Sequence, residues 1–214
     1  MEKKKKKKDA LAGIARKMAG DMPVWAPVKK EDNVLFAPLG SGDEPFFAFL
    51  NSKNAPKNVF FPHTETLMKF TRTPKGMVFS AEVNKTDASV LFGVRPCDAH
   101  SFVLLDKLFD QEKYKDGYYI EKRKSTTVIS LACVKPPYAT CFCTSVDGEP
   151  VCAAGADILL TDIGGDYLVE FITEKGEKLA KYFGETKADA AADTKKSEIA
   201  AKAKEAITSK IPAH

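Results

Sequence analysis

The 214-residue sequence contains no apolar run long enough to cross a bilayer, which takes about 18 consecutive apolar residues. Its first residues, Met1 and Glu2 followed by six lysines, also lack the apolar segment of a secretory signal peptide. We therefore expect a cytoplasmic protein with no membrane span. In that compartment thiols stay reduced, so that clustered cysteines more often bind metal than form disulfides.

The sequence also lacks the short motifs typical of common catalytic and nucleotide sites. It contains neither G-x-G-x-x-G nor G-x-x-x-x-G-K-[ST], so no local motif predicts a dinucleotide or nucleoside triphosphate site. No Ser–His–Asp set or carboxylate pair stands at an interpretable spacing, and hydrolytic chemistry has no support. Of the three histidines, His100 follows Cys97 by one helical turn and can face either that cysteine or solvent.

Positive charge is concentrated at the N-terminus. The net charge is +4, and the six lysines at positions 3–8 exceed it, so the rest of the chain is close to neutral. Such a run can contact nucleic acid or an anionic surface, but no basic or aromatic patch follows it downstream. We therefore interpret the run as the solvated start of a basic N-terminal helix covering residues 1–19, and we expect no nucleic-acid partner.

Two buried strands with a helix between them are predicted in the middle of the chain. Residues 88–94 (ASVLFGV) and 126–132 (TTVISLA) have the composition of buried strands, and residues 99–109 carry apolar side chains at helical spacing. Strand, helix and strand in this order predict a parallel βαβ unit. The predicted fold class is therefore α/β: a mixed sheet with a βαβ unit, an N-terminal helix and a C-terminal extension helix.

Shorter patterns predict the remaining elements. We expect hairpins from residues 22–28 with 34–38 and from 157–161 with 167–172, and short helices ending near residue 71 and spanning 174–183. From Glu185 onward the composition shifts to Ala, Lys, Glu, Asp and Thr with only a thin apolar stripe. We therefore divide the chain into the N-terminal helix (1–19), an α/β core domain with the cysteine site (20–184) and an extension or linker helix (185–214).

Four of the five cysteines fall in two places, each directly after a predicted buried strand. Cys97 follows the first strand, and Cys133, Cys141 and Cys143 follow the second. In open α/β sheets ligands gather at the carboxyl ends of strands, so we expect the two loops to meet at one edge. Cysteines as close as Cys141 and Cys143 rarely form a disulfide with each other but readily point at one metal centre.

The surroundings of these cysteines suit thiolate ligands. Cys97 is placed at the start of a helix, where the helix dipole and free N–H groups stabilise a thiolate and Arg95 adds positive charge. The same effects suit a reactive nucleophile. Prolines 136–137 hold the segment after Cys133 in a loop that can wrap around a metal. The fifth cysteine, Cys152, lies among small apolar residues and is interpreted as a packed side chain.

The spacing of the cysteines leaves the metal undecided. It is neither the C-x2-C-x2-C-x3-C run of bacterial ferredoxins nor the paired C-x2-C of common zinc ribbons. Four thiols can hold one [4Fe–4S] cluster, or one zinc ion in a structural module that serves as an assembly platform. A flavin held at the edge of the βαβ unit is a third alternative, although no phosphate-binding loop is visible.

Four ordered segments resemble a known family. They are VLFGVRPCDAH at 90–100, FFPHTETL at 60–67, GADILLTD at 155–162, and Cys133 followed by TCFCTS at 140–145. All four resemble the β-type iron–sulfur subunits of sulfhydrogenases and the A subunit of anaerobic sulfite reductase, within the family that contains two [4Fe–4S] clusters. The resemblance runs from about Trp25 to Leu179. Members usually continue into a C-terminal ferredoxin-like domain whose cysteine runs this sequence lacks, so only the N-terminal α/β region is covered.

The resemblance implies a cytoplasmic, non-catalytic electron-transfer subunit of an anaerobic oxidoreductase complex, such as a hydrogenase or a sulfite or sulfur reductase. Its partners would be other subunits of that complex, of the flavoprotein or ferredoxin type. The residues and the resemblance together lead us to expect a one-electron relay. Its predicted [4Fe–4S] ligands are Cys97, Cys133, Cys141 and Cys143, with Arg95 raising the potential and Thr140, Thr144 and Ser145 donating hydrogen bonds.

Overall fold

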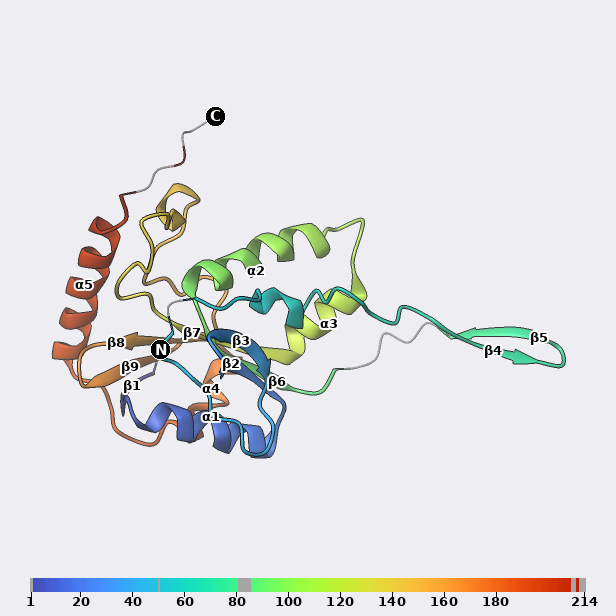
Figure 1. Ribbon diagram of the computed structural model, residues 1–214, viewed down its shortest axis with the longest axis horizontal. Coiled ribbons are helices and arrows are strands. Elements are labelled where there is room, and N and C mark those ends of the chain that lie inside the picture. Colours follow the sequence, from blue (N-terminus) through green and yellow to red (C-terminus); the bar gives the residue numbers. More distant parts are fainter. Residues whose placement is uncertain (1, 50, 81–85, 209–210, 212–214) are drawn as a thin grey trace.

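A seven-stranded sheet forms the centre of the structure, with helices on both of its faces (Figure 1). The structure is a computed structural model that describes residues 2–49, 51–80, 86–208 and 211. Among these residues no helix has both the length and the apolar character that a membrane span needs. Across the sheet the strands are β1 (Lys3–Lys7), β9 (Asp166–Phe171), β8 (Ile158–Asp162), β7 (Thr126–Leu131), β6 (Ser89–Val94), β2 (Val24–Lys30) and β3 (Asn33–Pro38).

The centre of the sheet is parallel and its margins are antiparallel. Strands β2, β6, β7 and β8 run in the same direction, whereas β1, β9 and β3 pair antiparallel with their neighbours. Every residue of β6 and β7 is buried. Parallel strands covered on both faces are the ones that read as continuous apolar runs, and the predicted α/β class with a mixed sheet is confirmed.

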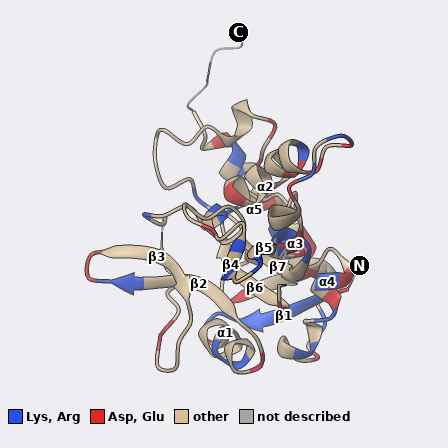
Figure 2. Ribbon diagram, turned by 90° about the vertical axis from the view of Figure 1, so that its right-hand side faces the viewer, with Lys and Arg blue, Asp and Glu red and all other residues tan. Residues whose placement is uncertain are grey.

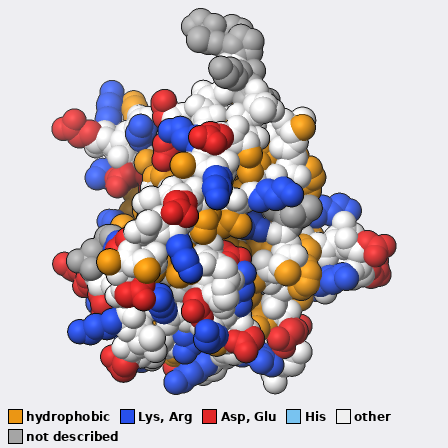
Figure 3. Space-filling view, turned by 90° about the vertical axis from the view of Figure 1, so that its left-hand side faces the viewer, with side chains coloured by type: hydrophobic (Ala, Val, Ile, Leu, Met, Phe, Trp, Pro, Cys, Tyr) orange, Lys and Arg blue, Asp and Glu red, His pale blue; other side chains and the backbone are white. Residues whose placement is uncertain are grey.

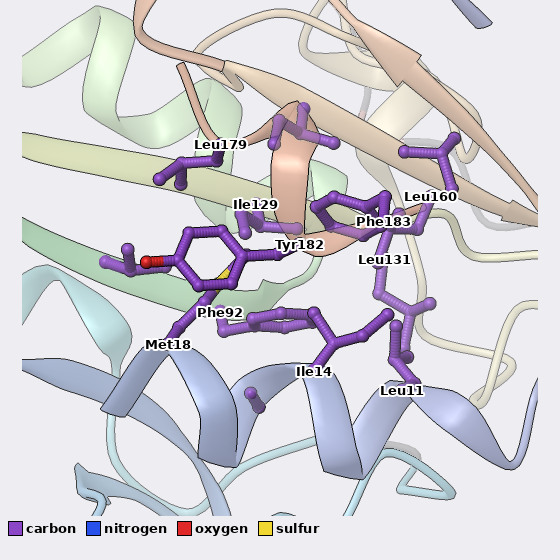
Figure 4. Close-up of a cluster of buried hydrophobic side chains, with 14 of the residues drawn as sticks. Leu11, Ile14, Met18, Phe92, Ile129, Leu131, Leu160, Leu179, Tyr182 and Phe183 are labelled. Carbon is purple, nitrogen blue, oxygen red and sulfur yellow. The ribbon is translucent and has the colours of Figure 1, made fainter. Parts of the chain in front are cut away.

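One face of the sheet is covered by α1 (Ala10–Asp21) and by the segment that follows β9. That segment contains α4 (Glu174–Glu177) and the 3-10 helix η3 (Ala180–Tyr182). In Figure 4, Leu11, Ile14 and Met18 of α1 point at the sheet. They pack there with side chains from the strands and from the η3 segment: Phe92, Ile129, Leu131, Leu160, Leu179, Tyr182 and Phe183.

The opposite face carries α2 (Pro96–Phe109), α3 (Gly117–Ser125) and the 3-10 helix η1 (Pro56–Val59) (Figure 1). Helices α2 and α3 connect β6 to β7, so the predicted βαβ unit is present with a second helix in its crossover. The sequence prediction missed α3, whose nine residues are mostly polar. Asp116 caps it by accepting hydrogen bonds from the backbone N–H groups of Tyr118 and Tyr119, and Tyr119 is its buried residue.

The lysine run is a strand, so its interpretation as the start of a helix was wrong. Residues 3–7 form β1 at the edge of the sheet, and α1 begins only at Ala10. Carboxylates neutralise the lysines: Lys7 pairs with Asp166 at 2.9 Å. Lys5 pairs with Asp189 at 2.8 Å. These ion pairs attach the strand to β9 and to the N-terminal end of α5. The division of the chain at residues 19 and 184 stays a prediction.

Lys4 is buried within this edge, with only 3 % of its surface exposed. Its ammonium donates to the carbonyl oxygen of Ala180 at 3.3 Å and lies 3.4 Å from the carboxylate of Glu2. The same group lies 5.8 Å from the centre of the Phe171 ring. A buried cation requires such partners, and here they come from the segments on either side of β1.

The C-terminal helix, α5 (Ala190–Glu205), is present as predicted and packs against the β1–β9 edge (Figure 1). Asp189 caps it by accepting from the N–H of Ala192 at 3.0 Å. Ala192 is buried against Ile163 and Leu168. Lys196 of the helix pairs at 2.6 Å with Glu170, a buried carboxylate of β9. The thin apolar stripe and the ion pairs with the edge strands together hold the helix against the sheet.

Both predicted hairpins are confirmed, as β2–β3 and β8–β9. The helix predicted to end near residue 71 was wrong. Residues 69–73 form the strand β4 (Lys69–Thr73), which pairs with β5 (Gly76–Ser80) outside the main sheet. The preceding segment runs extended beside α3, where Glu65 pairs with Lys122. The helix signals failed there because no face of residues 64–71 is buried.

Candidate metal centre

Cys97 and Cys133 follow two neighbouring parallel strands. Cys97 lies in the first turn of α2, directly after β6, and Cys133 comes two residues after the end of β7. Strands β6 and β7 are paired in parallel, with Val94 opposite Ser130. Their carboxyl ends therefore lie at the same edge of the sheet, which brings the α2 turn and the loop after β7 together.

A cavity of about 520 Å³ opens between these two segments. Cys141 and Cys143 also line it, so that the four thiols predicted as ligands surround one space. Around them the walls are largely apolar, from Leu104, Pro136, Pro137, Tyr138, Phe142, Val146 and Ile207. Sequence reasoning missed the apolar residues, since they come from α2, from the loop and from beyond α5.

The loop that carries three of the cysteines, residues 133–155, is folded by its own backbone. The N–H of Cys133 donates to the carbonyl of Pro150 at 2.9 Å, which closes the loop at its base. The Cys133 thiol donates to the carbonyl of Lys135 at 3.3 Å. A short 3-10 helix, η2 (Cys143–Ser145), turns the chain at the second thiol of the Cys-x-Cys pair. These bonds fix the direction in which the loop returns to the sheet.

The loop also packs closely on α2. A side chain on Gly148 would lie 3.3 Å from Nδ1 of His100 and 3.0 Å from the carbonyl oxygen of Cys143. The N–H of Gly148 donates to that same carbonyl at 2.9 Å. His100 lines the cavity, so of its two predicted orientations the structure has the one facing the cysteines.

Desolvation opposes ionisation of three of the cavity thiols, although the Cys97 residue as a whole is exposed. Desolvation raises the pKa of Cys97 to about 12, and the neighbouring carboxylate of Asp98 adds to the effect. Burial likewise raises the pKa of Cys133 and that of Cys143. Desolvation therefore opposes the stabilisation of a Cys97 thiolate that we expect from the start of the helix and from Arg95.

Arg95 stands between the cavity and the sheet. Its Nη2 donates to the carbonyl of Phe49, and its guanidinium lies 4.4 Å from the centre of the Phe49 ring. Burial lowers the pKa of Arg95, while the charges of Cys133 and Cys97 act in the opposite direction. Its Nε is buried and has no hydrogen-bond partner among the described residues. Arg95 is thus the cation that faces the thiols, as the sequence predicted.

The predicted hydrogen-bond donors differ in their placement. Thr140 lines the cavity, whereas Thr144 and Ser145 are absent from its walls. The hydroxyl of Ser145 accepts a hydrogen bond from the N–H of Ile211 at 3.2 Å. Cys152 also lies outside the cavity wall, half-buried, and its sulfur accepts from the N–H of Ala154 at 3.4 Å. This placement agrees with its interpretation as a packed side chain.

The four thiols share the lining of one cavity without forming a compact group of metal ligands. Within the part of the chain that the structure describes, no three His, Cys, Asp or Glu side chains are grouped closely enough to hold one metal ion. Tetrahedral zinc, with Zn–S bonds of about 2.3 Å, would need its sulfurs about 3.8 Å apart. A cubane is bulkier and holds its four thiolates roughly 6–7 Å apart. An all-sulfur donor set around an open space suits such a group.

The C-terminal segment closes one side of the cavity. Ile207 contributes to the wall, and Lys204 of α5 pairs with Glu149 of the cysteine loop at 2.7 Å. On the face that carries α5, hydrophobic side chains reach the surface between charged ones (Figure 3). Phe142, between the two thiols of the Cys-x-Cys pair, is itself exposed. The wall of the cavity therefore continues onto the molecular surface.

Sequence comparison identifies a relative over most of the chain. The chain is 28 % identical over 155 residues to sulfhydrogenase 2 subunit beta of Pyrococcus furiosus. The chain is a relative of the sulfhydrogenase beta subunits. The match covers 72 % of this chain but only 44 % of the P. furiosus subunit, so the chain spans less than half of the length of that protein. No protein-family profile matches the chain, and no solved structure matches it.

Proposed function

We propose that this sulfhydrogenase-beta relative is an electron-transfer subunit of a hydrogenase-type redox complex, and that Cys97, Cys133, Cys141 and Cys143 ligate one [4Fe–4S] cluster. The observation that carries the proposal is the placement of these four thiols around one cavity, at the carboxyl ends of two adjacent parallel strands. The relationship to a protein named as a subunit of a sulfhydrogenase supports the redox role.

Each part of the site has a task in this proposal. When bound, a cluster supplies reversible one-electron transfer. The four cysteines hold it, and the raised pKa values of Cys97, Cys133 and Cys143 mean that these three thiols lose their protons when a metal centre binds them. Leu104 and Phe142 give the cavity an apolar wall. Arg95 places a positive charge beside the thiols, which favours the reduced and more negative state.

The chain breaks no substrate bond in this mechanism. It accepts one electron from a flavoprotein or ferredoxin-type subunit and passes it to the next redox centre of the complex, which we place in the cytoplasm. Two exposed apolar side chains support an interface near the proposed cluster. Phe142 and Val146 are exposed at the mouth of the cavity, and an apolar contact there would bring a second redox centre close while keeping water out.

The proposal is tested by replacing the cysteines one at a time. Cys97→Ser, Cys133→Ser, Cys141→Ser and Cys143→Ser are each reconstituted with iron and sulfide under anaerobic conditions, beside Cys152→Ser as the matched control. We expect the wild type and the control to show the broad charge-transfer absorption of a cluster and an EPR signal on reduction. Each of the four cavity variants should lose most of that absorption.

The same series separates a relay from a structural zinc module that uses the same ligands. Stoichiometric zinc in protein purified without oxygen, with no iron bound after reconstitution, would contradict the relay. Full cluster absorption in the Cys97→Ser variant would contradict the proposed ligand set, because Cys97 is the ligand that joins α2 to the loop.

A further inference from the structure

Strands β4 and β5 form an arm, residues 69–80, that extends away from the body of the molecule (Figure 1). They pair antiparallel from Lys69 opposite Ser80 to Thr73 opposite Gly76. At the tip, the Thr73 hydroxyl donates to the carbonyl of Gly76 at 2.9 Å, and Gly76 takes a φ of +128° that favours glycine. The turn is therefore well formed, and the hairpin is a two-stranded sheet separate from the main sheet.

The arm exposes large apolar side chains that a free surface rarely carries. Phe70 is 67 % exposed, Met77 61 % and Phe79 60 %, and Val78 is exposed as well. A two-stranded hairpin is at best marginally stable alone in water, and a contiguous exposed apolar patch marks an interaction site. These features indicate that another surface covers the apolar side chains of the arm.

The apolar side chains are ordered by the strand register. Phe70 stands directly opposite Phe79, with ring centres 6.3 Å apart, and Arg72 stands opposite Met77. Directly opposed residues share one face of an antiparallel pair. One face of the arm is therefore a strip of two phenylalanines and a methionine that carries a single cation.

The base of the arm is fixed to the body. The Tyr118 hydroxyl donates to the carbonyl of Leu67, and Lys122 pairs with Glu65, both contacts being made by α3. Leu67 and Met68 are themselves exposed, so the apolar strip continues down to this attachment. The body thus holds the base while the strip is presented at a distance from it.

The charge of the arm indicates what kind of surface would cover it. Residues 69–80 contain three cations, Lys69, Arg72 and Lys75, and no acidic residue. The whole chain has a net charge of +4, and 4 − 3 leaves only +1 for everything outside the arm. The body therefore offers no net acidic surface to a second copy, and two arms repel each other. In Figure 2 basic residues lie along this end of the molecule.

We propose that the arm docks into an apolar groove bordered by carboxylates on a different protein chain. Carboxylates would meet Arg72 and Lys75, and the groove would bury Phe70, Met77 and Phe79. A nucleic-acid partner is disfavoured, because such sites are dominated by cations on phosphates whereas large apolar side chains dominate this strip. The inference goes beyond the proposed relay and does not require the cluster.

A photo-crosslinker on the full-length chain tests the proposal. p-Benzoylphenylalanine replaces Phe79 in the cells that naturally make the protein, and a control protein carries it at Lys195, an exposed position on α5. The crosslinked peptides are sequenced by mass spectrometry. We expect the Phe79 probe, and not the Lys195 probe, to reach one site on a different chain where acidic residues flank apolar ones.

Binding of the identified partner, purified, is then measured against charge-reversed arms. Arg72→Glu with Lys75→Glu should weaken binding by at least about tenfold, and added salt should weaken it too, whereas Lys195→Glu should change it by less than about twofold. Unfolding midpoints of the variants establish that the body is intact. The proposal is overturned by crosslinks from the Phe79 probe to a second copy of this chain, to nucleic acid or to lipid. It is equally overturned by the absence of any arm-specific crosslink, or by affinity that the charge reversal leaves unchanged.

Discussion

The backbone at Gly155 lies directly against the carbonyl of Ala99 in the first turns of α2. A side chain carbon on Gly155 would stand 1.9 Å from the Ala99 oxygen, and Gly155 has a φ of +77°. This contact joins the end of the cysteine loop to the helix that carries Cys97. The two halves of the candidate metal centre are therefore held together by a backbone approach that only glycine permits.

Gly155→Ala should destabilise the protein by about 2–4 kcal/mol, because the methyl group meets rigid backbone and the positive φ is strained. Gly164→Ala is the matched control, since Gly164 has a φ of +114° and nothing near its missing side chain. Denaturant unfolding measures both free energies. Equal losses for the two variants would show that the close approach to Ala99 contributes nothing.

Lys4→Ala should cost about 1–3 kcal/mol of stability, because it removes a buried stem and the partners of its ammonium. Lys7→Ala, in the same strand but exposed and paired only at the surface with Asp166, should have little measurable effect. Thermal and denaturant unfolding compare the two. If both lysines can be removed with the same small effect, Lys4 is not a buried anchor of β1.

The phenol of Tyr182 should lose its proton at a higher pH than an ordinary tyrosine. Its burial and its hydrogen bond to Asp21 raise its pKa to about 12, above the ordinary value near 10. Because the folded state holds this proton more tightly than the unfolded chain does, the contribution of Tyr182 to the free energy of unfolding is fully present below about pH 10. It is lost as the pH rises towards 12. Phenolate absorbance of the wild type minus Tyr182→Phe should show this late component. Asp21→Asn should move it back towards 10, and a component already near 10 in the wild type would contradict the account.

Arg95→Met should lower the reduction potential of the reconstituted site by on the order of tens of millivolts, because it removes the cation that faces Cys97 and Cys133. Arg95→Lys, which keeps the charge but loses the planar contact with Phe49, should restore most of the potential. Redox titration followed by EPR measures both variants. An unchanged potential in Arg95→Met, with the cluster fully loaded, would remove Arg95 from the mechanism.

The central strands and the hairpins could be predicted from the sequence because their signals are local. Strands β6 and β7 are rich in apolar and β-branched residues, and β2–β3 is bounded by residues that form turns. The lysine strand β1 could not be predicted in this way. Its stability comes from Asp166, Asp189 and Glu170, which lie more than 150 positions away along the chain.

The sequence predicted that the cysteine segments meet at one edge of the sheet, but it did not predict the pKa values of the thiols. The position of Cys97 and Cys133 after adjacent buried strands was enough to place them at one edge. The raised pKa values of Cys97, Cys133 and Cys143 come mainly from desolvation in the folded protein, which no spacing reveals. The arm formed by β4 and β5 escaped prediction because exposed Phe70 and Phe79 give no burial pattern.

The most direct test of the account is the metal content of the wild-type chain, purified and reconstituted without oxygen. The account predicts about four iron atoms and four acid-labile sulfides per chain, with an EPR signal that appears on one-electron reduction. Stoichiometric zinc without iron, or iron that binds equally well when Cys97 is replaced by serine, would contradict it.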